Sequence, residues 1–203
     1  MKLLSITYKG FNLLYSKCTR PFNKLWIKWL FAANNVKYSS FSSNGIPFIS
    51  VSMKGSMSIG QNFKMNNGIK GNPIGSYRKC TFNVVRGASL NIGANVGISQ
   101  TALVCTDSIT IGDNVKIGGG VSIYDTDFHS LDPEIRKSRF DTANRKSAPV
   151  KICDNAFIGA HSIILKGVTI GENAIVGAGS VVTKSIPSNE IWGGCPAKFI
   201  KKI

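Results

Sequence analysis

The residues that could do chemistry gather in one polar segment, residues 124–151. Histidine side chains titrate near neutral pH, so the histidine of this segment, His129, could accept a proton from a hydroxyl group. A neighbouring carboxylate would orient the ring and stabilise the imidazolium that forms. Asp125, Asp127 and Asp132 are the candidates for this partner, and the sequence does not choose among them. The alternative is a loop histidine that is merely solvated.

The second histidine, His161, follows Gly159 and Ala160, and we expect it to be a wall or structural residue and not a base. A zinc site of the carbonic anhydrase type takes three histidine ligands, and the chain has two histidines, so no metal site is predicted. Five cysteines without a CxxC pair predict free thiols in a reducing compartment.

A six-residue repeat lies on both sides of the polar segment. Branched aliphatic residues recur at every sixth position after it, with small or β-branched residues two positions earlier and glycine often one position later. These positions are Ile152, Ile158, Ile164, Ile170, Val176 and Val182. The same register runs through Ile92, Ile98 and Val104, slips by one residue, and continues through Ile111, Ile117 and Ile123. A looser set is Met53, Ile59 and Met65.

A period of six fits neither a helix nor an ordinary alternating strand, and it predicts an all-β fold. Three hexapeptides would make one coil of a triangular parallel β-helix, with the aliphatic residue pointing to the axis. Asn and Gly in segments such as 112–114 and 171–173 would occupy the corners, where positive φ is needed. A β-sandwich with glycine-rich turns is the alternative, but its turns would not keep a six-residue spacing. Residues 124–151 would then protrude as a loop.

Residues 1–50 show no hexapeptide and are predicted to form a short helical extension ahead of a β-helix domain at 51–203. Apolar residues alternate there with lysines, and Pro21 is expected to break the run into two short helices or a helix and a turn. This extension could pack on one end or side of the solenoid. The alternative is a basic amphipathic element that lies on a membrane surface or a partner.

The formal net charge is +15, and no Asp or Glu precedes Asp107. The basic N-terminal half should attract phosphates, acidic polymers or anionic membrane surfaces. No nucleic-acid motif is visible, so nucleic acid is not an expected partner. No signal peptide and no apolar run of the roughly 18 residues needed to span a bilayer is apparent, which favours a cytoplasmic location. Peripheral contact with the inner face of the membrane is the alternative.

Three motifs carry a family resemblance: DTDFHSLDPEIR at 125–136, GVTIGENAIVGAGSVVTKSIP at 167–187, and GGCPAKFIKKI at 193–203. Together with the repeat, they resemble the hexapeptide acyltransferases, and among these the maltose, galactoside and capsular-polysaccharide O-acetyltransferases. The resemblance covers about residues 55–203. It implies a left-handed parallel β-helix, a homotrimer with active sites between neighbouring solenoids, acetyl-CoA along the C-terminal coils, and His129 as general base.

The resemblance also implies which residues meet each ligand. The backbone N–H of Ala160 would stabilise the oxyanion. Small residues at 177–179 would let a thin cofactor approach the backbone, and lysines near the C-terminus would pair with its phosphates. The expected cofactor-binding residues are Phe157, Gly159, Ala160, Gly177, Ala178, Thr183, Lys184, Lys198 and Lys201. The expected acceptor-binding residues are Ser99, Gln100, Thr101 and Tyr124.

The chain departs from the family pattern at three places. Phe157 stands where the family often has Trp, and Cys195 stands where Asn or Val is usual. The sequence Ser-Gln-Thr at 99–101 replaces the region that usually carries an acceptor-binding Asn. The expected reaction is transfer of an acetyl group from acetyl-CoA to a hydroxyl of a sugar or polysaccharide. The alternatives are serine, an antibiotic or a sugar amine as the acceptor, or a solenoid scaffold without catalysis.

Overall fold

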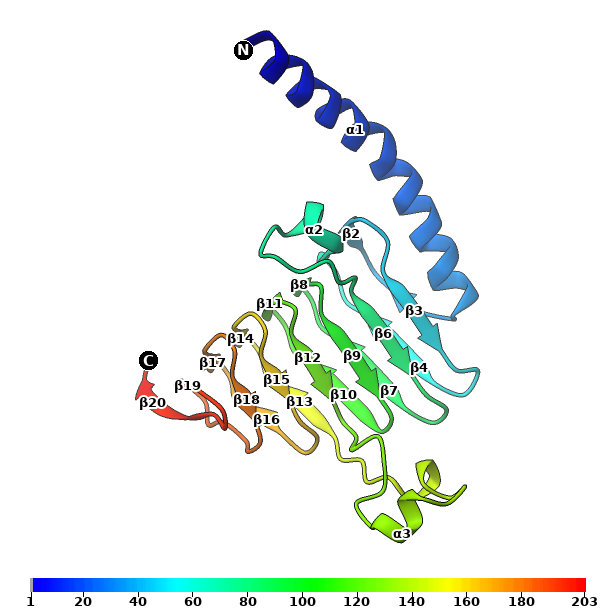
Figure 1. Ribbon diagram of the computed structural model, residues 1–203, viewed down its shortest axis with the longest axis vertical. Helices are drawn as coiled ribbons and strands as arrows, with labels where there is room; N and C mark the ends of the chain where they lie inside the picture. Colours follow the sequence, from blue (N-terminus) through cyan, green and yellow to red (C-terminus); the bar gives the residue numbers. More distant parts are fainter. Residues whose placement is uncertain (1) are drawn as a thin grey trace.

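The computed structural model describes residues 2–203 as a helix, α1 (Lys2–Ala33), followed by a three-sided solenoid of short strands (Figure 1). Sheet A contains β1 (Lys37–Tyr38), β4 (Ser56–Ile59), β7 (Ser89–Ile92), β10 (Ser108–Ile111), β13 (Val150–Ile152) and β16 (Thr169–Ile170). Sheet C contains β3 (Phe48–Val51), β6 (Thr81–Val84), β9 (Ala102–Cys105), β12 (Ser122–Tyr124), β15 (Ile163–Ile164) and β18 (Val181–Val182).

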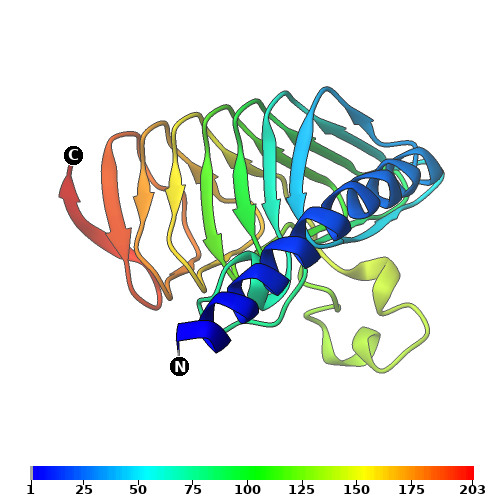
Figure 2. The same cartoon turned by 90° about the horizontal axis from the view of Figure 1, so that it is seen from above.

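Sheet B has eight strands and closes the C-terminal end. Its strands are β2 (Phe41–Asn44), β5 (Phe63–Asn66), β8 (Gly97–Ser99), β11 (Lys116–Gly119), β14 (Phe157–Ile158), β17 (Ile175–Val176), β19 (Glu190–Gly193) and β20 (Lys198–Lys202). Neighbouring strands are parallel in all three sheets, except that β19 and β20 form an antiparallel hairpin. This hairpin extends sheet B beyond the last coil (Figure 2).

The hexapeptide aliphatic residues stack in register along the axis, as predicted. In sheet A, Ile92 is paired with Ile111, Ile111 with Ile152, and Ile152 with Ile170, and all four side chains are buried. Asparagines at the corner between sheets A and B adopt positive φ and form a ladder of side-chain hydrogen bonds. The Nδ2 atom of each donates to the Oδ1 atom of the next along Asn62, Asn95 and Asn114, at 3.1 Å per step.

Two positions assigned to the repeat were wrong. Val104 is half-buried, and Leu103 one residue earlier is buried and in register with Ile123, so the spacing is five residues from Ile98 and eight residues to Ile111. Met53 is fully exposed in a turn, while Met57 is buried in β4. Both errors arise where a corner has a non-standard number of residues.

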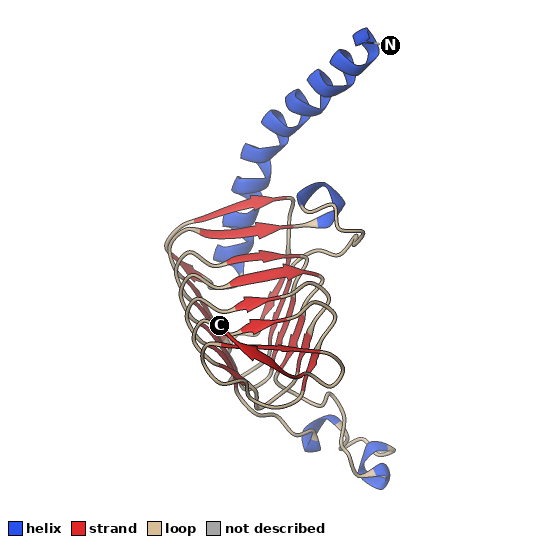
Figure 3. Cartoon of the chain, turned by 90° about the vertical axis from the view of Figure 1, so that its left-hand side faces the viewer, coloured by secondary structure: helices blue, strands red, loops and turns tan. Residues whose placement is uncertain are grey.

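The N-terminal extension is one continuous helix, although Pro21 was expected to break it. A proline inside a helix removes one hydrogen bond and favours a bend. Figure 3 shows α1 curved and extending beyond the solenoid toward its N-terminal end, while its last turns pack against the first coil. There Ile27 and Phe31 are buried, and the ring of Phe31 lies 5.0 Å from that of Phe41. The strands begin at Lys37, so the first coil falls within the 1–50 extension assigned from the sequence.

Two segments leave the solenoid. The segment between β12 and β13 contains α3 (Pro133–Arg136) and the short 3-10 helix η1 (Thr142–Asn144), and it protrudes as predicted (Figures 1 and 3). The segment 67–80, between β5 and β6, contains the single turn α2 (Gly68–Gly71) and was not foreseen as a separate loop.

Candidate active site

His129 is held by a carboxylate that the sequence did not single out. Its Nδ1 atom lies 2.6 Å from Oδ2 of Asp141, and the other oxygen of Asp141 accepts from the backbone N–H of Ser130 at 2.7 Å. The hydrogen bond with His129, followed by that from Ser130, lowers the pKa of the Asp141 carboxyl. An ionised Asp141 fixes the ring so that its other nitrogen, Nε2, is left for proton transfer, and the His129 side chain is 66% exposed.

The three aspartates predicted as partners of His129 interact with other groups. Asp125 is buried and accepts hydrogen bonds from the backbone N–H groups of Thr106 and Asp107, which fastens the start of the loop to the preceding coil. Asp127 forms an ion pair with Lys166 at 3.1 Å. Asp132 caps α3 by accepting from the N–H of Glu134 at 2.8 Å, with a proline at the first helical position.

Both ends of the loop are tied together, which makes His129 part of a defined structure. Thr126 and Ser147 form an antiparallel bridge, and the N–H of Ala148 donates to the carbonyl of Asp125 at 2.9 Å. Farther out, Nη1 of Arg136 donates to the carbonyl of Ser130 at 2.9 Å. The loop leaves the solenoid at the corner between sheets C and A, because β12 belongs to sheet C and β13 to sheet A.

The residues expected to bind acetyl-CoA lie at two different corners of the solenoid. Thr183 and Lys184 follow β18, so they lie at the same C–A corner as the His129 loop, and both are exposed. The other expected residues lie at the B–C corner or on strands β14 and β20 of sheet B: Phe157, Gly159, Ala160, Gly177, Ala178, Lys198 and Lys201. At about 3.3 Å per residue, the strands of sheet C separate the two corners by roughly 10–15 Å.

The B–C corner is built tightly around the backbone of Ala160. A Cβ atom on Gly118 would lie 2.5 Å from the Ala160 nitrogen, and a Cβ atom on Gly159 would collide with the nitrogen of Ala178. Within residues 2–203, no backbone carbonyl accepts from the N–H of Ala160. Phe157 is 47% exposed on β14 beside this corner. The arrangement suits a thin ligand that approaches the backbone and needs a hydrogen-bond donor.

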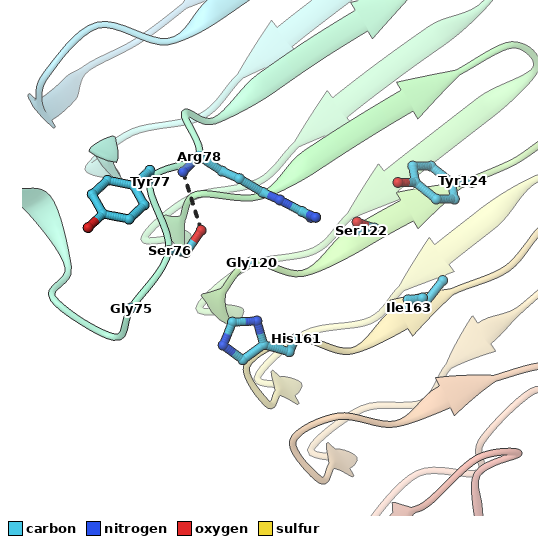
Figure 4. A pocket seen from close by; sticks show the side chains of 9 residues that line it. All are labelled: Gly75, Ser76, Tyr77, Arg78, Gly120, Ser122, Tyr124, His161 and Ile163. Atoms are coloured by element: carbon cyan, nitrogen blue, oxygen red, sulfur yellow. Dashed lines mark hydrogen bonds between the residues drawn. The ribbon is translucent and has the colours of Figure 1, made fainter. Parts of the chain in front are cut away.

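A pocket of about 770 Å³ lies on sheet C next to this corner. Its floor comes from β12 and β15 and its roof from the 67–80 loop (Figure 4). The Arg78 side chain reaches from the loop toward Ser122 and Tyr124, and His161 lies at the edge beside Gly120 (Figure 4). The residues that line it are Gly75, Ser76, Tyr77, Arg78, Gly120, Ser122, Tyr124, His161 and Ile163.

Of the four residues expected to bind the acceptor, only Tyr124 lines this pocket. Ser99, Gln100 and Thr101 are all buried. The side-chain amide of Gln100 instead holds the 67–80 loop, because its Nε2 donates to the carbonyls of residues 68, 72 and 76 at 2.9–3.0 Å. Sequence reasoning missed Arg78 and Tyr77. The Gly- and Pro-rich stretch 67–75 was the signal that could have revealed a loop there.

His161, which was expected to be a wall or structural residue, lines the pocket on sheet C. Its backbone has positive φ, its N–H donates to the carbonyl of Gly119 at 2.9 Å, and its ring lies where a Cβ atom on Gly120 would be.

The five cysteines are free thiols. Burial raises the pKa of the Cys80 thiol to about 11 and that of Cys105 to about 12, so neither is a nucleophile near neutral pH. Among the described residues, no group of His, Cys, Asp and Glu could hold a metal ion.

Comparisons with known proteins agree with this architecture. The family model described as "Hexapeptide repeat of succinyl-transferase" matches residues 90–125 and 149–184. The chain is 39% identical over 118 residues to a galactoside O-acetyltransferase of Escherichia coli, an alignment that covers 58% of this chain and 56% of that protein. The chain therefore spans little more than half the length of this curated relative.

Two solved structures are also similar. A hexapeptide-repeat acetyltransferase of Vibrio cholerae in complex with acetyl-CoA has 31% identity and a TM-score of 0.51, covering 61% of this chain and 63% of that one. An N-acyltransferase of Bacillus cereus, in complex with dTDP and coenzyme A, has 25% identity and a TM-score of 0.61, covering 86% and 88%. The left-handed β-helix of hexapeptide repeats and the resemblance to acetyltransferases of this type are thus confirmed.

Proposed function

We propose that this protein transfers an acetyl group from acetyl-CoA to a hydroxyl of a carbohydrate, with His129 as the general base. The observation that carries the proposal is the contact of 2.6 Å between His129 Nδ1 and Asp141, on an exposed loop whose ends are fastened to the solenoid. The likeness to acetyltransferases, one of them in complex with acetyl-CoA, supports the choice of reaction.

The protein residues would supply what a thioester lacks. Bound acetyl-CoA would bring a carbonyl carbon that is already activated for attack. Nε2 of His129 would take the proton from the acceptor hydroxyl as the new C–O bond forms, and Asp141 would stabilise the imidazolium. The N–H of Ala160 would donate to the carbonyl oxygen as negative charge develops there. As the C–S bond breaks, His129 would return the proton to the departing sulfur, which regenerates the base.

A homotrimer would bring the two halves of the site together. In one copy of the chain, His129 lies at the C–A corner and Ala160 at the B–C corner, which are the two opposite ends of the strands of sheet C. These groups act on the same carbonyl in the proposed mechanism, so they need to lie within a few ångströms of each other. We propose that the C–A corner of one copy faces the B–C corner of the next, which also joins Thr183 and Lys184 to the remaining cofactor-binding residues.

The pocket beside the B–C corner is the proposed acceptor site. Tyr77 and Tyr124 offer aromatic faces and hydroxyl groups, and the hydroxyl of Ser122 and the Arg78 guanidinium add polar groups that suit sugar oxygens. Arg78 brings a positive charge, and no Asp or Glu lines the pocket. An acceptor with a carboxylate or phosphate is therefore favoured over a neutral one.

A sugar amine is the second candidate acceptor, because the B. cereus structure to which this chain is similar is an N-acyltransferase. The same base would serve, since an ammonium group must also lose a proton before it attacks. The proposed test separates these acceptors.

The test is acetyl-CoA turnover, followed as free thiol release, with a panel of neutral sugars, uronic acids, sugar phosphates and amino sugars. Replacement His129→Ala should lower acceptor-dependent turnover by about 10²–10⁴-fold, the usual contribution of a general base. Leu131→Ala, at an exposed position two residues away on the same loop, is the control and should keep most of the activity. Turnover that depends on no acceptor in the panel, or that survives His129→Ala, would contradict the proposal.

A further inference from the structure

Eight of the ten large apolar residues exposed on the described part of α1 form one stripe, and the other two, Ile6 and Leu13, lie on the opposite side of the helix. At about 100° per residue, the eight residues of the stripe fall within a sector about 120° wide. Ile27 and Phe31, which are buried against the first coil, lie on the opposite side of the helix. The side chains of the stripe are 51–78% exposed: Leu4, Tyr8, Phe11, Leu14, Phe22, Leu25, Trp26 and Trp29.

Lysines flank this stripe, and α1 contains no acidic residue. Lys17, Lys24 and Lys28 are exposed and, at about 100° per residue, lie on one side of the helix, about 40–80° beyond the Leu14 edge of the stripe. Lys9 and Arg20 lie on the far side of the helix. The rings of Trp26 and Trp29 stack with their centroids 4.9 Å apart at the end of the helix nearest the solenoid. Aromatic rings and long lysine stems of this kind suit a boundary between apolar and aqueous phases.

We propose that α1 is an in-plane anchor that binds the protein to an anionic lipid bilayer through this stripe. Within residues 2–203, no helix is long and apolar enough to cross a membrane, so insertion along the surface is the mode that α1 allows. An interfacial helix combines an apolar face with flanking cations that meet acidic headgroups. This inference goes beyond the proposed acyl transfer and does not depend on it.

A second copy of α1 is the competing occupant of the stripe, and the charges argue against it. Helices that pair through a seam normally carry opposite charges along its edges. Two copies of α1 would bring only lysines together there, because the helix has no Asp or Glu. An anionic surface, in contrast, complements Lys17, Lys24 and Lys28, which lie on the same side of the helix.

The test is co-sedimentation of the full-length protein with vesicles of phosphatidylcholine alone or mixed in equal parts with phosphatidylglycerol. We expect binding to the anionic vesicles that weakens with added salt, and little binding to the zwitterionic ones. Leu14→Ser should weaken the anionic binding about tenfold, because the leucine would no longer enter the apolar layer. Each of Lys24→Gln and Lys28→Gln should weaken it about fivefold.

Leu13 supplies a matched control one residue away. It is 61% exposed against 64% for Leu14, but it lies off the stripe, so Leu13→Ser should change binding less than twofold. In a Trp192→Phe variant the only tryptophans are Trp26 and Trp29, whose emission should shift to the blue with anionic vesicles.

Three results would overturn the proposal. The first is equal binding of wild-type protein to both vesicle types, or binding to neither. The second is an equal effect of Leu13→Ser and Leu14→Ser. The third is a lipid-free oligomer that Leu14→Ser dissociates while vesicle binding stays as in the wild type, which would assign the stripe to a second copy of the chain.

Discussion

Replacing Gln100 by Met should loosen the 67–80 loop without destabilising the solenoid. The Gln100 side chain is 1% exposed, and its amide nitrogen donates to three loop carbonyls at 2.9–3.0 Å. An amide carries two hydrogens, so the three carbonyls share two donors. Methionine has almost the same shape but no donor, and it leaves these carbonyls to water.

The magnitude follows from the number of hydrogen bonds lost. Two hydrogen bonds at ~1 kcal/mol each give about 2 kcal/mol in favour of the closed loop. Oε1 of Gln100 is buried without a partner among the described residues, and removing it returns part of this free energy. We therefore expect a net loss of ~1–2 kcal/mol, which raises the fraction of molecules with an open loop by roughly 5–30-fold.

Limited digestion with trypsin measures this opening directly, because Arg78 and Lys79 lie in the loop. When reclosing is faster than cleavage, the cleavage rate follows the open population and should rise by the same factor. Gln61→Met is the control, since Gln61 is the other glutamine of the chain and is exposed. The melting temperature should change little in either variant. An unchanged rate of cleavage after Arg78 would refute the assignment of Gln100 as the residue that holds the loop.

Three further outcomes are expected. Gly159→Ala should abolish coenzyme A binding, measured by calorimetry, and lower thermal stability, because its Cβ atom would collide with the Ala178 nitrogen. Asp141 has a lowered pKa, so its contribution to stability should be full above 3.8, the ordinary aspartate value, and be lost as the pH falls below it. A pH series of unfolding midpoints for wild type and Asp141→Asn should therefore differ near neutral pH and converge in acid. Cys80 and Cys105 should resist a thiol reagent at pH 8 (about the range where ordinary thiols react), while mass spectrometry finds the exposed cysteines labelled.

The repeat could be predicted because each hexapeptide repeats one local geometry. An aliphatic residue on every side must point to the axis. Asparagine and glycine tolerate positive φ, so their positions in the sequence indicate the corners. The two errors, Val104 and Met53, came from corners of irregular length. At such corners the spacing along the chain departs from six residues, although the strands still pair in register. The helix break predicted at Pro21 was wrong, because an exposed helix tolerates the loss of one backbone hydrogen bond when the adjacent turns keep theirs.

The partner of His129 could not be predicted in the same way. Asp141 is twelve residues from His129 in the chain, and irregular turns around α3 and η1 bring it back. Proximity in the sequence favoured Asp125, Asp127 and Asp132, yet each of these is used to fasten or cap the loop. Carboxylates that build a loop and the carboxylate that orients a base have the same residue type, so only their hydrogen bonds distinguish them.

The solenoid explains how such loops can carry specificity without disturbing the fold. Strands stack by backbone register, so a corner can be extended by any length if the chain returns to the same strand position. The 67–80 loop enters and leaves at the B–C corner, and β5 and β6 still pair with their neighbours in the preceding and following coils. The loop's anchor, Gln100, is buried in the next coil. Residues that choose the acceptor, such as Arg78, can therefore vary on the loop, while the residues that fix its position stay inside the repeat and keep the pocket aligned with Ala160.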